Sequence, residues 1–97
     1  MQGISLAELY NVISSSHDAE FRYDGTTYVL QTELDEGSSF LVIWDCTPNA
    51  PKCLAKYRIS DQNTIPEQVI DKILNDKCFN GKSFMDIEQD VVVDVIY

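Results

Sequence analysis

The sequence predicts one α+β domain over residues 1–97, an antiparallel sheet of about five strands with helices packed on one face. Two segments repeat apolar residues at the spacing of amphipathic helices, and five segments show the alternation or the β-branched composition of strands. The chain has the length of a single domain and contains no internal repeat, low-complexity tract or interdomain linker. The predicted order is an N-terminal helix, four strands, a second amphipathic helix, a short third helix and a last strand.

The first helix has a clear start signal. Ser5 and Glu8 have the spacing of a capping box, in which each side chain bonds the backbone N–H of the other residue. An apolar stripe at helical spacing follows, made of Leu6, Leu9, Tyr10 and Ile13. Three consecutive serines, which favour turns over helix interiors, predict that this helix ends near residue 15.

The next segment predicts a β-hairpin. Residues 20–23 and 26–30 have the composition of strands, and Asp24-Gly25 between them supplies the positive φ angles of a type I′ turn. A two-residue loop at this position pairs Phe21 with Tyr28 and gathers aromatic side chains on one face of the sheet.

Two more strands are predicted after a polar turn at residues 33–38. Residues 39–46 are apolar on both faces, which indicates an inner strand that is at least partly covered on each side. A loop is predicted at residues 47–52 from its prolines and asparagine. Residues 53–59 alternate between apolar and basic side chains, which is typical of a half-exposed strand.

The last third of the chain predicts two helices and a strand. Thr64 and Glu67 repeat the capping-box spacing before an amphipathic helix at residues 65–76. Ser83 is placed to cap a short helical turn that runs to Ile87. The β-branched run that ends the chain, residues 91–97, predicts the final strand.

Charge and hydropathy exclude several classes of function. Sixteen acidic and seven basic residues give a formal net charge of -9, so direct binding to nucleic acid or to an anionic membrane is not expected. No apolar stretch is long enough to cross a bilayer, and the first residues lack the pattern of a signal peptide. Together with an odd number of cysteines, these features predict a cytoplasmic protein.

The cysteines and the lone histidine do not form a recognisable reactive site. Cys46, Cys53 and Cys78 are expected to be reduced and buried as small apolar side chains, with a Cys46–Cys53 bridge as the alternative. No Cys-x-x-Cys or histidine pair is present to bind zinc. His17 stands between a serine and an aspartate, but consecutive residues do not converge as a catalytic triad does.

The one phosphate-binding pattern is incomplete. Gly81-Lys82-Ser83 resembles the end of a phosphate-binding loop, but Asp76 stands where the loop needs its first glycine. We therefore expect no enzymatic activity, no catalytic residues, no metal and no cofactor.

Two clusters of acidic residues are the predicted partner-binding site. General acid–base catalysis needs one carboxylate in a buried environment, whereas both clusters lie in polar segments. We predict that they face a basic protein surface, the alternatives being an acidic surface that serves only solubility and a cation site. The residues are Glu33, Asp35, Glu36, Asp86, Glu88, Asp90 and Asp94.

The predicted strands are also rich in aromatic residues, namely Phe21, Tyr23, Tyr28, Phe40 and Trp44. RNA-binding sheets surround such rings with basic side chains, and few are available here. Core packing is the expected role, with a small exposed interaction patch as the alternative.

Two segments, Glu20–Tyr28 and Asp76–Ile87, resemble recurring segments of small uncharacterised acidic proteins from phages and mobile elements of Gram-positive bacteria. That class includes anti-CRISPR proteins. The resemblance implies a non-enzymatic inhibitor that mimics nucleic acid and occupies the nucleic-acid-binding groove of a basic protein. The alternative function is a structural or assembly domain, in which two copies pair through the sheet edge at residues 91–97.

Overall fold

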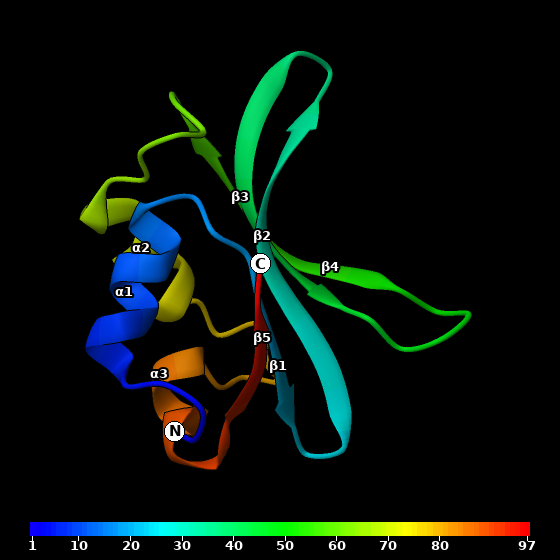
Figure 1. Cartoon of the computed structure of the whole chain (residues 1–97). Coiled ribbons are helices and arrows are strands. Elements are labelled where there is room, and N and C mark those ends of the chain that lie inside the picture. The colour runs from blue at the N-terminus through cyan, green and yellow to red at the C-terminus, as the bar shows by residue number, and fades with distance from the viewer.

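The computed structural model describes the whole chain, residues 1–97 (Figure 1). It contains three α-helices, one 3-10 helix and five strands. In chain order these are α1 (Leu6–Ser14), β1 (Ala19–Tyr23), β2 (Thr26–Asp35), β3 (Ser38–Asp45), β4 (Lys52–Ile59), α2 (Glu67–Leu74), α3 (Phe84–Ile87), η1 (Glu88–Asp90) and β5 (Val92–Ile96). The predicted α+β class and the predicted order of the elements are confirmed.

The five strands form one antiparallel sheet in the order β4-β3-β2-β1-β5. The strand from the end of the chain, β5, pairs with β1, so β4 and β5 are the two edges. All three α-helices lie on the same side of this sheet, and no helix covers the other side (Figure 1). The molecule therefore has two layers and one open sheet face.

Three two-residue turns share one geometry. Asp24-Gly25, Glu36-Gly37 and Asn80-Gly81 all have positive φ angles, between 51 and 85°. The predicted hairpin around Asp24-Gly25 is confirmed, with Phe21 paired with Tyr28. The predicted turn at residues 33–38 is too long, because two residues suffice to reverse the chain and β2 continues to Asp35.

The helix starts follow local chemistry. Ser5 and Glu8 form the predicted capping box of α1, and Ser83 forms another with the N–H of Asp86 at the start of α3. The predicted Thr64 cap is wrong. Pro66 forces the preceding residue out of helical geometry, so α2 starts only at Glu67 and has no side-chain cap.

The main core lies between the helices and the sheet and consists of 18 buried residues. Phe21 is at its centre, stacked on Tyr28 with ring centroids 5.4 Å apart and in edge contact with Phe84 at 5.3 Å. Leu41 and Ile43 of β3 belong to the same cluster. Because side chains alternate along a strand, their neighbours on β3 point to the open face.

No helix in the structure combines the length and the apolar character that a membrane crossing requires.

Candidate interaction surface

Alternate residues of β2 and β3 form the centre of the open face. The strand register sets Val29 opposite Trp44 and Gln31 opposite Val42. Glu33 is opposite the next residue in this row on β3, Phe40. Since β2 extends to Asp35, Glu33 is a strand residue on this face and not part of a turn as the sequence predicted.

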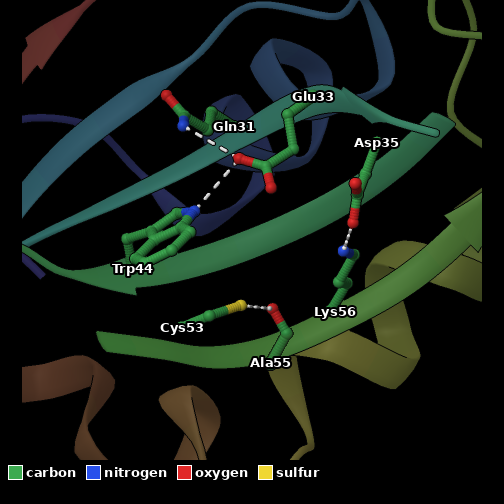
Figure 2. Close-up of polar contacts among 7 residues, drawn as sticks. All are labelled: Gln31, Glu33, Asp35, Trp44, Cys53, Ala55 and Lys56. Atoms are coloured by element: carbon green, nitrogen blue, oxygen red, sulfur yellow. Dashed lines mark hydrogen bonds and ion pairs between the residues drawn. The ribbon is translucent and has the colours of Figure 1, made fainter. Parts of the chain in front are cut away.

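A hydrogen-bonded group crosses this face (Figure 2). The indole Nε1 of Trp44 donates to Oε2 of Glu33 at 3.0 Å, and Nε2 of Gln31 donates to the same oxygen at 3.4 Å. The other carboxylate oxygen of Glu33, Oε1, accepts no hydrogen bond from these side chains. The indole ring is therefore fixed in orientation while half of the carboxylate stays available.

Val42 lies in the register row between those of Glu33 and Trp44, and it is 0% exposed although no helix covers it. Gln31 of β2 and Lys56 of β4 flank Val42 in the register. The Lys56 ammonium pairs with Asp35 at 2.5 Å and lies 4.4 Å from the centroid of the Phe40 ring. The prediction that β3 is at least partly covered on each face is confirmed, because Val42 is buried on the face that no helix covers.

A groove of about 520 Å³ runs from Trp44 to the β3–β4 loop. This loop extends away from the sheet (Figure 1), and several of its residues line the groove. The groove contains one carboxylate and no basic side chain, and its lining residues are Val29, Gln31, Glu33, Trp44, Cys46, Thr47, Pro48, Asn49 and Pro51. Its size falls within the range of about 300–1,000 Å³ that is typical of ligand sites.

A larger hollow, of about 600 Å³, lies beside Ser38, Ser39 and Arg58. Three of its eight lining residues are serines, and it contains no aromatic ring. The Trp44 groove is the better candidate because it combines an oriented aromatic ring with a charged group.

The thiols are not activated. Burial, followed by the charges of Glu20 and Asp45, raises the pKa of Cys46, and burial followed by the charge of Glu33 raises the pKa of Cys53. Burial also raises the pKa of Cys78, to about 11. All three cysteines are free, and the thiol form dominates near neutral pH.

The expectation that all three cysteines are buried is wrong, because Cys46 is exposed and Cys53 and Cys78 are only partly buried. Cys46 follows the last residue of β3, where the chain leaves the sheet for the β3–β4 loop. No three or more His, Cys, Asp and Glu side chains converge as ligands for a metal ion.

The first predicted acidic cluster is divided among different roles. Glu33 belongs to the groove, and Asp35 is paired with Lys56. Glu36 is in the turn that joins β2 to β3, where its φ angle is 52° and its carboxylate has no hydrogen-bond partner in the chain.

The second predicted cluster is mostly engaged within the fold. Asp86 caps α3 and pairs with Lys77 at 2.6 Å, and these bonds lower its pKa to about 2. Glu88 accepts a 2.8 Å bond from the amino group of Met1. Asp90, in η1, has no side-chain partner.

Asp94 forms a two-pronged pair with Arg22, at 2.7 and 3.0 Å, which lowers the pKa of Asp94. Arg22 is on β1, beside the strand that carries Asp94. The β2–β3 hairpin and the α3–η1 segment lie at opposite ends of the molecule (Figure 1). The structure therefore does not bring the seven predicted acids together on one surface.

Sequence reasoning missed the groove itself. The alternation of residues 39–46 placed Trp44 and Phe40 on one face, which was the signal for an exposed patch. Assigning Glu33 to a turn separated it from Trp44, its partner in the structure.

Comparison of the chain with protein-family models, with curated proteins and with solved structures finds no match.

Proposed function

We propose that this chain is a non-enzymatic protein-binding module that recognises a basic partner through the open face around Trp44. The observation that carries the proposal is the Trp44–Glu33 hydrogen bond, which holds an aromatic ring and a carboxylate side by side at the base of a groove. Aromatic anchors with a nearby polar group are typical of protein-binding surfaces.

The charge of the whole chain supports a basic partner. A net charge of -9 attracts cationic surfaces over a distance of about a Debye length, which speeds their encounter. Long-range attraction and the local groove then have separate roles, since the first sets the rate of association and the second selects the ligand.

Mimicry of nucleic acid is a narrower form of the same proposal, in which the partner is a basic nucleic-acid-binding protein of the kind that anti-CRISPR proteins inhibit. It needs an array of free carboxylates in place of phosphates. Asp35, Asp86, Glu88 and Asp94 already pair with cations of the same chain, and only Glu33, Glu36 and Asp90 of the seven lack such a pair. The groove therefore gives the broader proposal more support than the acidic clusters give mimicry.

Assembly of two copies through β5 is the second candidate, because Val95, Ile96 and Tyr97 are 38 to 62% exposed at a sheet edge. Two features oppose it. Gln2 already pairs with the start of this edge, and the register shifts beside Asp94, a device that protects edges from pairing. The repulsion between two chains of net charge -9 adds to these.

The proposal is tested by selecting ligands for the purified chain from a display library of random short peptides. We expect the enriched peptides to be rich in arginine and lysine, and their affinity to fall as salt rises from low to physiological concentration. Enrichment of neutral or acidic peptides, or no enrichment, would contradict the proposal. Sedimentation of the same sample tests the second candidate, which requires a dimer.

A further inference from the structure

We infer that the groove beside Trp44 binds an arginine side chain of the partner, with the guanidinium stacked on the indole and bonded to Oε1 of Glu33. The inference rests on the proposed function and specifies its ligand. Two features of the groove carry it, the fixed indole plane and the carboxylate oxygen left without a partner.

The geometry favours arginine over lysine. A guanidinium is flat, so it can lie on an aromatic ring while its edge N–H groups reach a carboxylate. An ammonium is a compact, strongly hydrated charge that does not match a flat ring in this way. In the groove the ring and the carboxylate belong to one hydrogen-bonded unit, which presents both contacts to a single flat cation (Figure 2).

The remaining walls suit the rest of such a ligand. Val29, Pro48 and Pro51 offer apolar surface for the methylene groups of the arginine and for the neighbouring backbone. Gln31 donates to the same oxygen of Glu33 as the indole does, at 3.4 Å, so both bonds leave Oε1 free for the ligand.

The surroundings of the groove are negative. Beyond the effect of burial, the charges of Glu20 and Asp45 raise the pKa of Cys46, and the charge of Glu33 raises the pKa of Cys53, against a smaller opposing effect of Lys56. Lys56, the neighbour of Val42 on β4, is held by Asp35 and by the Phe40 ring, and it makes no hydrogen bond to the Glu33 oxygen that we assign to the ligand. A cationic side chain would therefore find the Glu33 carboxylate unpaired, with Lys56 bonded elsewhere.

The test uses the fluorescence of Trp44, the only tryptophan of the chain. The probes are a capped peptide with one arginine between glycines, and the same peptide with lysine or with citrulline, the uncharged isostere of arginine. We expect a saturable change with the arginine peptide, with binding weaker by about fivefold for lysine and by about tenfold or more for citrulline. Equal affinity for arginine and lysine, or no saturable change, would overturn the inference.

Two variants locate the site. Glu33→Gln keeps a side-chain oxygen for the Trp44 indole but removes the charge, and we expect it to weaken the arginine peptide about tenfold. Glu67→Gln is the matched control, because it removes one exposed carboxylate in the first turn of α2, outside the groove. We expect it to change the affinity less than twofold at physiological salt. Equal losses in the two variants would mean that only net charge matters and would overturn the inference.

The same variants distinguish this inference from the proposed function. Basic peptides from the display selection are measured against the parent chain and against Glu33→Gln. If they bind both chains equally, the protein-binding function stands and the arginine site is wrong. If no basic peptide binds the parent chain, both are wrong.

Discussion

Glu33 on β2 and Trp44 on β3 reach toward each other across the sheet and join through one 3.0 Å hydrogen bond directly above the row that contains Val42. Glu33 is opposite Phe40 in the register and Trp44 is opposite Val29, so the bond runs diagonally from one strand to the other. Val42 is the one buried apolar residue outside the main core, and the bond orients the ring that borders the groove.

The first prediction concerns the burial of Val42 on the open face. Val42→Ala removes two methyl groups from a fully buried site and should lower the free energy of unfolding by about 1–3 kcal/mol. Val95→Ala is the matched control, since Val95 is 39% exposed on β5, and it should cost less than about 0.5 kcal/mol. Urea unfolding measures both. An equal loss of unfolding free energy in the two variants would contradict the burial of Val42.

A second prediction tests the turn between β1 and β2. A Cβ at Gly25 meets no atom within 4 Å, so any effect of substitution comes from its φ angle of 78°. Gly25→Val should destabilise the fold by about 1–3 kcal/mol, because a β-branched residue resists positive φ. Gly25→Asn should cost less, since asparagine tolerates this region. Thermal unfolding compares them, and identical midpoints for the parent and the valine variant would rule out the turn.

The third prediction concerns the order in which the cysteines react. In the native protein iodoacetamide should modify the exposed Cys46 first and Cys78 last. Cys78 is partly shielded, and its pKa of about 11 keeps the thiolate fraction low. Mass spectrometry of timed samples gives the order, and unfolding in urea should remove the difference. Modification of native Cys78 as fast as Cys46 would contradict the structure.

The fourth prediction is a loss of stability in alkali. Burial and a bond to Asp71 raise the pKa of Tyr10 to about 12, and a bond to Asp76 together with burial raises the pKa of Tyr57 to about 12. The folded state therefore retains these phenolic protons more tightly than the unfolded chain, in which tyrosine has a pKa of about 10. The stabilisation is complete below pH 10 and is lost as the pH rises from about 10 through about 12.

Tyrosinate absorbance and urea unfolding across this pH window provide the measurement. Tyr10→Phe and Tyr57→Phe keep the rings and remove the hydroxyls, so the double variant should lose less stability between pH 10 and 12 than the parent. An identical loss in the parent and the double variant would show that these hydroxyls do not cause it.

Most of the fold could be predicted because its signals are local. The Ser5–Glu8 cap, the Asp24-Gly25 turn and the alternation of β3 each depend on residues close in the sequence. The error at Thr64 is also local, since Pro66 prevents the helix from starting earlier. The strand order could not be predicted, because pairing β5 with β1 depends on contacts between distant segments.

The candidate site was harder to predict for the same reason. The partners of the predicted acids lie far away in sequence, as with Arg22 and Asp94, 72 positions apart. A cluster of charges in the sequence therefore did not become a cluster in space. The Trp44–Glu33 pair became visible only when the length of β2 and its register with β3 were known.

A chemical-shift map of the ¹⁵N-labelled chain with a selected basic peptide tests most directly whether the open face around Trp44 is the binding surface. We expect the largest shifts on the Trp44 indole N–H, on Glu33 and on the β3–β4 loop, and we expect Glu33→Gln to reduce them while Glu36→Gln does not. Largest shifts on Asp86, Asp90 and Asp94, with the Trp44 indole unchanged, would contradict this expectation. The second acidic cluster would then be the binding site.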